Sequence, residues 1–256
     1  MAKVISVEEW LREQCSEYGW GLGGVFRSKG EHDWPLIATD EADLESKLNE
    51  GGHILPLPEE PAALANVLEV GIVSFLMNRV DQLDGATATR GTIRGYPDLE
   101  LGGPIFGGGF HAVDVKIAKR AMSRRGVPLD RTQSRITLYT GNTYFRHPEH
   151  AFPGVMRPFG EYASHLDVLG IYTFNESKPG RVDDLELIVQ PPWKIASKDR
   201  SSTTREYIGA VKKIADLRDG NGDFATEEEF YTYWRRYRFK IARAAEQVLA
   251  KQAAKK

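Results

Sequence analysis

The stretch from Tyr96 to Lys116 constrains the fold of this chain more than any other. It begins Tyr-Pro-Asp, passes through a glycine-rich turn at 102–109 and ends Asp-Val-Lys. The pattern predicts strands over 98–101 and 110–117. Because side chains alternate along a strand, the second strand has an apolar face and a mixed face. The apolar face carries Val113, Val115 and Ile117, and the mixed face carries Ala112, Asp114 and Lys116. A carboxylate and an ammonium thus project together from an apolar strand, where an unpaired charge is costly to bury.

Asp98 after Pro97, followed by Asp114 and Lys116, matches the Pro-Asp…Asp-x-Lys pattern of Mg²⁺-dependent nucleases. Two carboxylates can share a hard divalent cation that keeps several of its waters. Such an ion polarises a phosphate oxygen and acidifies a bound water, while the lysine orients that water or balances developing charge. The pattern is short, so a solvated β-hairpin with an Asp–Lys pair remains the structural alternative.

Composition bounds the class of protein. The chain has 256 residues, 41% of them hydrophobic and 27% charged, which is ordinary for a soluble globular protein with a sizeable core. We expect no membrane span and no signal peptide, because no apolar run has the required length. Cys15 is the only cysteine, which excludes an internal disulfide framework or a multi-cysteine zinc site and fits a reducing cytoplasm.

Charge is distributed unevenly along the chain. The net charge is −2, but residues 1–60 hold 13 acidic and 5 basic side chains, so that residues 61–256 carry +6. Affinity for nucleic acid comes from phosphates neutralised locally. The asymmetry therefore permits DNA binding without requiring it.

The N-terminal half predicts mostly helices around short strands. Ser6 and Glu9 form a capping box for a first helix with Trp10 and Leu11 on its apolar face. Short strands are expected over 24–27 and 34–37, a helix over 40–49 and a proline-marked linker before residue 61. A long helix is expected over 61–84, with Glu69 beside its apolar stripe, either as a rim carboxylate or as a third metal-site acid. A polar loop over 85–95 follows.

The C-terminal half predicts strands and a final basic helix. Strands are expected over 136–139, 168–174 and 185–189, and a helix over 158–167. A capping box at Thr226 and Glu229 begins a helix that runs nearly to the C-terminus. It carries Arg235 and Arg236, which form either a solvated basic face or a phosphate contact.

Several motifs occur together in the order and approximate spacing of one known family. They are Tyr96-Pro-Asp, Asp114-Val-Lys, Pro158-Phe-x-x-Tyr162, Leu169-Gly-Ile-Tyr-Thr, Trp193-x-Ile-Ala, Ile208-Gly and Glu228-Glu-Phe-x-x-Tyr-Trp-Arg-x-Tyr237. From about Gly24 to Tyr237 the chain resembles the EcoRV-like type II restriction endonucleases of the PD-(D/E)xK nuclease superfamily. The resemblance implies an α/β fold of the restriction-endonuclease type, with a central mixed β-sheet flanked by helices.

The resemblance also implies a catalytic set. Asp98, Asp114 and Lys116 match the family's catalytic pair and lysine, and Glu69 matches a helix carboxylate near the metals, with the same 29-residue gap to Asp98. The implied cofactor is Mg²⁺, one or two ions per subunit, held by Asp98 and Asp114 with Glu69 at a weaker position.

Implied DNA contacts lie in two loops and on the last helix. Thr92, Ile93 and Arg94 match the minor-groove loop, although the glutamine- and asparagine-rich stretch of the family is absent. The segment between Ala196 and Ile208 matches the major-groove recognition loop. Its own sequence departs from the family, so base contacts do not carry over. The candidate DNA-contact residues are Thr92, Ile93, Arg94, Ser201, Ser202, Thr203, Thr204, Arg205, Glu206, Arg235 and Arg236.

By resemblance, the protein is a cytoplasmic prokaryotic homodimer that cuts palindromic double-stranded DNA, leaving blunt ends with 5′-phosphates. A single domain over 1–256 is expected: residues 1–60 for dimerisation, 61–190 as the catalytic core, and 191–256 for the recognition loop and C-terminal helix. A cognate DNA methyltransferase is implied, not as a stable partner. The alternatives are a structure-specific repair nuclease of the same superfamily and a non-cleaving DNA-binding protein on the same fold.

Overall fold

The computed structural model describes residues 4–20, 39–40, 42–43, 61–92, 95–140, 145–177, 181–201, 207–237 and 243–253. The helices are α1 (Val7–Ser16), α4 (Pro61–Val80), α5 (Pro192–Ile195), α6 (Ile214–Asp219), α7 (Glu227–Arg236) and α8 (Arg243–Ala253), with short 3₁₀ helices η1 (Pro104–Phe106) and η2 (Phe159–Glu161). The strands are β1 (Thr87–Arg90), β2 (Leu99–Gly102), β3 (Phe110–Met122), β4 (Pro128–Thr132), β5 (Thr137–Thr140), β6 (Tyr162–Phe174), β7 (Val182–Gln190), β8 (Ala196–Arg200) and β9 (Tyr207–Ala210).

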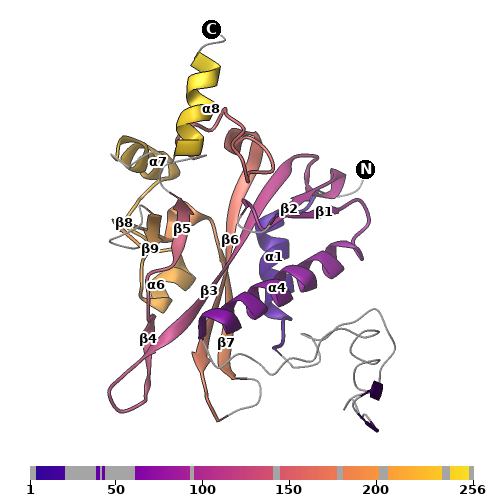
Figure 1. The fold of residues 1–256 in the computed structure, drawn as a ribbon, viewed down its shortest axis with the longest axis vertical. Helices are drawn as coiled ribbons and strands as arrows, with labels where there is room; N and C mark the ends of the chain where they lie inside the picture. Colours follow the sequence, from indigo (N-terminus) through magenta and orange to yellow (C-terminus); the bar gives the residue numbers. More distant parts are fainter. Residues whose placement is uncertain are drawn as a thin grey trace.

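A central mixed sheet organises the molecule (Figure 1). Its strand order is β1-β2-β3-β6-β7, and β4 also pairs with β3. Strand β3 pairs antiparallel with β2 and parallel with β6, while β6 pairs antiparallel with β7. The expected central mixed sheet with flanking helices is therefore confirmed.

One face of this sheet is covered by α1 and α4. Val113 and Val115 of β3 and Val168 of β6 are buried there against both helices. The predicted capping box begins α1, because the Ser6 hydroxyl accepts a hydrogen bond from the backbone N–H of Glu9 at 3.3 Å. The alternation expected along β3 thus sends its valines toward the helices and its charged residues to the opposite face.

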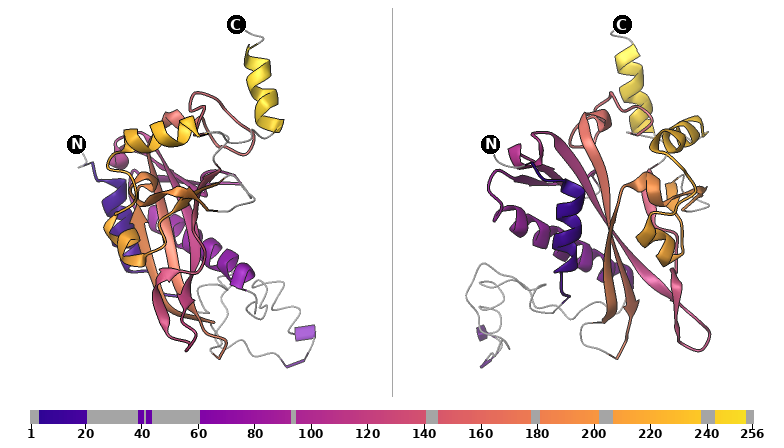
Figure 2. Two further views of the ribbon diagram at one scale, coloured as in Figure 1. Left: turned by 90° about the vertical axis from the view of Figure 1, so that its left-hand side faces the viewer. Right: turned by 180° about the vertical axis from the view of Figure 1, so that it is seen from behind.

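The opposite face packs against a second layer made of the antiparallel sheet β5-β9-β8 and helices α6 and α7. In this layer Phe230 and Trp234 of α7 are completely buried. Figure 2 shows α7 and the small sheet together at one side of the central sheet, with α8 projecting beyond them at the C-terminal end. The charged residues of β3 therefore lie on the face of the central sheet that is turned toward the second layer, which carries the proposed recognition segment.

Helix α4 is, among the described residues, the one helix long and apolar enough to cross a membrane, by length and composition alone. One side of this helix packs on the central sheet: Leu64, Leu68, Ile72 and Leu76 are completely buried, and the helix contacts β3 and β1. Its last residue is Val80, so the predicted end at residue 84 is four positions too late.

The helix predicted over 158–167 is wrong. Only residues 159–161 form a turn of 3₁₀ helix, after which the long strand β6 begins at Tyr162. Pairing with β3 on one side and β7 on the other fixes the extended backbone. Long-range pairing here overrides a local pattern that is ambiguous in a short apolar run.

Two further predictions need correction. The loop predicted over 85–95 contains β1, a strand that pairs antiparallel with β2. The C-terminal helix is also not continuous as far as the structure describes it: α7 ends at Arg236, Tyr237 has an extended backbone, and α8 begins at Arg243. The predicted strands over 24–27 and 34–37, the linker at 56–58 and most of the predicted 40–49 helix lie outside the described residues.

Candidate active site

The turn between β2 and β3 brings Asp98 to Asp114. Leu99 pairs with Val113 across the two strands, so Asp98 lies directly beside the start of the charged face of β3. Its Oδ2 accepts a hydrogen bond from the backbone N–H of Val115 at 2.7 Å, which fixes the carboxylate. The turn requires glycine at 103, where φ is +106° and a Cβ would lie 2.2 Å from the Gly85 carbonyl oxygen.

Lys116 joins the two aspartates. Its Nζ lies 2.6 Å from Asp114 Oδ2 and 3.9 Å from Asp98 Oδ2. The side chain of Asp114 is only 6% exposed, whereas that of Lys116 is 27% exposed and so reaches solvent. The site therefore combines a buried carboxylate, that of Asp114, with an ammonium that reaches solvent.

Electrostatics couples these three groups. Burial raises the pKa of Asp114 to about 7; the ammonium of Lys116 acts against this increase, and repulsion from Asp98 adds to it. Burial alone lowers the pKa of Lys116, but attraction to Asp114 and Asp98 outweighs it and raises this pKa above its ordinary value. The lysine is therefore a charged donor at neutral pH.

Glu69 approaches the same site from α4. Burial raises the pKa of Glu69, repulsion from Asp98 adds to this, and attraction to Lys116 and Arg90 acts against it. The glutamate thus lies within electrostatic reach of the aspartate and the lysine. The structure brings Asp98, Asp114 and Lys116 together, and the role of Glu69 in a metal site stays a prediction.

Asp167 on β6 is a residue that the sequence reasoning missed. It pairs in register with Asp114, and its side chain is buried among the same charged groups, whose fields act on it. The position was assigned to a helix, which hid its alignment with β3. The available signal was a single carboxylate inside the otherwise apolar run Leu-Asp-Val-Leu-Gly-Ile-Tyr.

The segment between Ala196 and Ile208, predicted as the recognition loop, includes strand β8 and the start of β9, which pair antiparallel as the β8–β9 hairpin. Ser201 directly follows β8; its N–H donates to the Tyr207 carbonyl at 2.9 Å and its hydroxyl accepts from Thr137 of β5 at 2.9 Å. The polar groups of Ser201 are therefore hydrogen-bonded within the protein. The rest of the predicted contact segment, Ser202, Thr203, Thr204, Arg205 and Glu206, lies outside the described residues.

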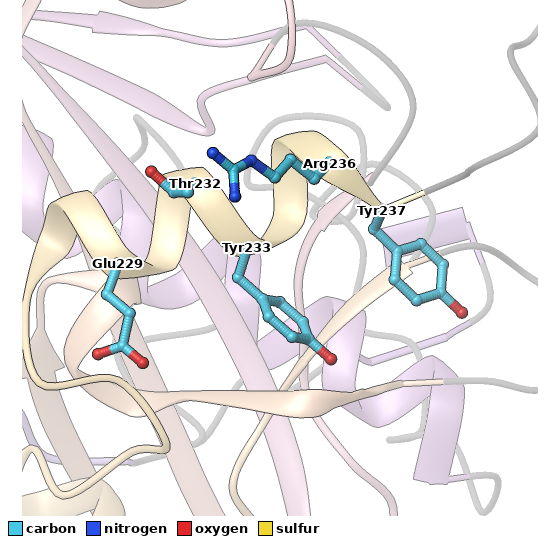
Figure 3. A pocket seen from close by; sticks show the side chains of 5 residues that line it. All are labelled: Glu229, Thr232, Tyr233, Arg236 and Tyr237. Carbon is cyan, nitrogen blue, oxygen red and sulfur yellow. The ribbon is translucent and has the colours of Figure 1, made fainter.

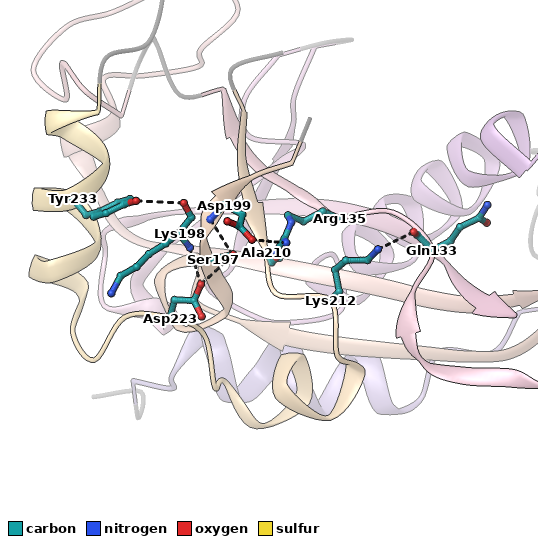
Figure 4. A network of polar contacts seen from close by, with 9 residues as sticks. All are labelled: Gln133, Arg135, Ser197, Lys198, Asp199, Ala210, Lys212, Asp223 and Tyr233. Atoms are coloured by element: carbon teal, nitrogen blue, oxygen red, sulfur yellow. Dashed lines mark hydrogen bonds and ion pairs between the residues drawn. The ribbon is translucent and has the colours of Figure 1, made fainter. Parts of the chain in front are cut away.

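A polar network braces this hairpin against its surroundings (Figure 4). Asp223 Oδ2 accepts hydrogen bonds from the Ser197 hydroxyl at 3.0 Å and from the Lys198 N–H at 2.8 Å. Arg135 donates to the Ala210 carbonyl at 3.1 Å and to Asp199 at 2.8 Å. Because Ser197 is buried, these bonds position the hairpin as well as satisfying its polar groups.

The remaining candidate DNA contacts differ in how they are used. Arg235 donates to the Phe145 carbonyl at 3.1 Å and lies over the Tyr231 ring, so it has a structural role. Arg236 is exposed and lines an open pocket of about 440 Å³ with other residues of α7 (Figure 3). Thr92 is exposed, and Ile93 and Arg94 lie outside the described residues.

Comparison with known proteins agrees with this geometry. The family model described as "Restriction endonuclease EcoRV" matches residues 30–254. The chain is also similar to the type II restriction enzyme EcoRV of Escherichia coli, with 23% identity over 203 residues that cover 73% of this chain and 78% of the relative. The family model matches nearly the whole chain, and the fold brings the acidic residues of the Pro-Asp…Asp-x-Lys pattern together. These two observations identify the family. The chain belongs to the EcoRV restriction endonuclease family.

Proposed function

We propose that the protein is a type II restriction endonuclease that hydrolyses palindromic double-stranded DNA in the presence of Mg²⁺. The family makes it a DNA-acting endonuclease of a restriction system. The observation that carries the finer proposal is the cluster of Asp98, Asp114 and Lys116 on adjoining strands, with both carboxylates within 4 Å of the ammonium. A non-cleaving relative would have no need of this set.

Among the described residues, no group of three or more His, Cys, Asp and Glu side chains is arranged to hold a metal ion as the structure stands, and the ammonium of Lys116 lies 2.6 Å from Asp114. The chemistry of the donors still suits a hard divalent cation, because they are carboxylate oxygens, as Mg²⁺ prefers. Beside them, Asp167 Oδ2 is buried with no hydrogen-bond partner among the described residues. Asp98 and Asp114 would hold the ion, with Glu69 serving a second, weaker position. When bound, the ion supplies Lewis-acid polarisation of the phosphate and a more acidic water.

The chain's own groups then account for positioning and charge. Lys116, protonated and partly exposed, donates a hydrogen bond to the attacking water or to a phosphate oxygen. The water oxygen attacks phosphorus, the bond to O3′ breaks, and the leaving O3′ takes a proton to become a hydroxyl. The product strand keeps its 5′-phosphate. Because the ammonium lies 2.6 Å from Asp114 and is partly exposed, Lys116 would have to move toward solvent when Asp98 and Asp114 hold the ion.

A homodimer follows from palindromic specificity, since a two-fold protein reads two-fold DNA. Residues 1–60 are proposed to contribute to dimerisation. Val70 on the outer side of α4 is 48% exposed, an apolar position that also suits a subunit contact. Each subunit would cut one strand and leave blunt ends. The protein would act in the prokaryotic cytoplasm, where a methyltransferase protects the host's own sites.

Digestion of a sequenced plasmid tests the proposal. With Mg²⁺ we expect discrete fragments whose ends share one palindrome, and with EDTA we expect none. A smear would favour a structure-specific or non-specific nuclease. Retained DNA binding without any cleavage in Mg²⁺ or Mn²⁺ would favour a DNA-binding protein on the same fold.

A further inference from the structure

Asp167 is a buried carboxylate that the proposed catalytic set does not use. It lies in the middle of β6, where its neighbours Leu166 and Val168 point to the helix-covered face. In the parallel pairing of β3 and β6 it is in register with Asp114. Side chains in register on adjacent strands share a face and lie about 4.8 Å apart, the spacing between strands. Asp167 therefore points into the same site as Asp114.

The contacts of Asp167 leave its charge unbalanced. The residue is 1% exposed, and its Oδ2 has no hydrogen-bond partner within the part of the chain that the structure describes. Lys116 is the cation that acts on it, and that ammonium already lies 2.6 Å from Asp114. Three aspartates thus face one lysine. A buried carboxylate without a partner is costly, so the arrangement calls for more positive charge.

We propose that Asp167 is a third carboxylate of the cation site, which binds the divalent ion together with Asp98 and Asp114. The inference rests on the proposed metal-dependent function and adds a ligand group to it. Carboxylates bind a metal ion in their ionised form. With all three ionised, they and the one ammonium sum to two negative charges, which one divalent ion neutralises.

The competing explanation is a structural acid that stays protonated and serves folding alone. Such a group would normally donate its proton to a nearby acceptor, because buried polar atoms are nearly always paired. The two explanations differ in cation affinity. A ligand carboxylate sets that affinity, whereas a folding carboxylate leaves it unchanged.

Mn²⁺ binding to the full-length protein separates them. Wild type, Asp167→Asn and Asp167→Leu are titrated with Mn²⁺, and the unbound ion is followed by electron paramagnetic resonance. Asp130→Asn is the matched control, because Asp130 is an exposed aspartate on β4 of the same sheet. Melting temperatures in EDTA and in Mn²⁺ are measured for all four proteins.

We expect both Asp167 variants to bind Mn²⁺ at least roughly tenfold more weakly than wild type, because loss of a group at or beside a metal site typically lowers metal affinity by about 10–100-fold. Their melting temperatures in EDTA should equal or exceed that of wild type, because a buried repulsion is removed, and their gain from Mn²⁺ should shrink. Asp130→Asn should match wild type in both measurements.

Two results would overturn the inference in different ways. If wild type binds Mn²⁺ and both Asp167 variants bind it equally well, Asp167 is not part of the cation site and the proposed function is unaffected. A lower melting temperature in EDTA with unchanged affinity would assign the residue to folding in the same way. If wild type itself binds no divalent ion, the metal-dependent function is wrong, and this inference falls with it.

Discussion

The proposed catalytic centre and the β8–β9 hairpin are held in place in different ways. At the centre, Asp114 is fixed by strand pairing on both sides of β3, so its surroundings depend on the register of the whole sheet. The hairpin is a short antiparallel ladder braced by side chains such as Asp223. The comparison teaches that the chemistry is placed by backbone pairing, which tolerates little change, whereas the proposed DNA reading is placed on a loop that can vary.

The largest expected effect comes from removing a residue of the proposed catalytic centre. Asp114→Ala or Lys116→Ala should reduce cleavage by about 10³-fold or more, because charge stabilisation at the phosphate is lost. Specific DNA binding should survive with Ca²⁺ in place of Mg²⁺. Single-turnover rates and gel-shift titrations check both statements.

Lys119→Ala is the control for the lysine, since Lys119 lies on the same strand over the Phe174 ring. It should cut at a rate close to wild type. A near-normal rate in either Asp114→Ala or Lys116→Ala would show that the centre has been assigned to the wrong residues.

A second prediction compares Glu69 with Asp98 within the proposed catalytic centre. Because it comes from a helix and not from the paired strands, Glu69→Ala should slow cleavage by about 10–100-fold, less than Asp98→Ala. Single-turnover rates of the two variants at saturating Mg²⁺ decide the order. An equal loss in both would make Glu69 a primary ligand.

The role proposed for the β8–β9 hairpin is tested by the DNA sequence that the protein recognises. Arginine suits the O6/N7 edge of guanine and a carboxylate suits the cytosine amino group. Arg205 and Glu206 therefore predict a six-base palindrome, cut at its centre, with more G·C character in its outer half-sites than EcoRV's. Arg205→Ala should lose about 1–3 kcal/mol of discrimination at one defined position. Cleavage rates on a set of singly substituted sites measure this. A uniform loss over all of them would assign Arg205 to the phosphate backbone.

The smallest expected effect concerns the brace of the hairpin. Asp223→Ala leaves the buried Ser197 hydroxyl without its acceptor, which should cost about 1–2 kcal/mol of unfolding free energy. DNA affinity should fall, while the cleavage rate at saturating DNA stays close to wild type. Urea unfolding and single-turnover kinetics test the variant, with exposed Asp84→Ala as control. A large loss of cleavage rate at saturation would mean that the two regions are not separate.

The sequence predicted the centre better than the elements around it. Alternation along residues 110–117 placed Asp114 and Lys116 on one face, because period-two patterning is a local property of a strand. Asp167 was missed because the first part of its strand, up to residue 167, was predicted as a helix, and only pairing with β3 distinguishes the two. Strand β1 lies in a segment predicted as a loop, and its pairing with β2 is likewise not visible in a local pattern. Arg235 has a structural role and Arg236 is exposed, because Arg235 donates to the carbonyl of the distant Phe145. No local sequence pattern reveals that contact.

The parallel pairing of β3 with β6 also has a consequence for the order in which the protein assembles. Asp98 and Asp114 meet through a short hairpin loop, whereas Asp167 reaches Asp114 only after a chain segment of about 50 residues has closed. Contacts between distant residues form late, since loop closure precedes the interactions that reward it. The two hairpin aspartates therefore come together early, and the third carboxylate arrives only when the whole sheet has formed. Cation affinity should accordingly develop in step with global folding, so that a partly folded or truncated chain has the signature residues but not the site.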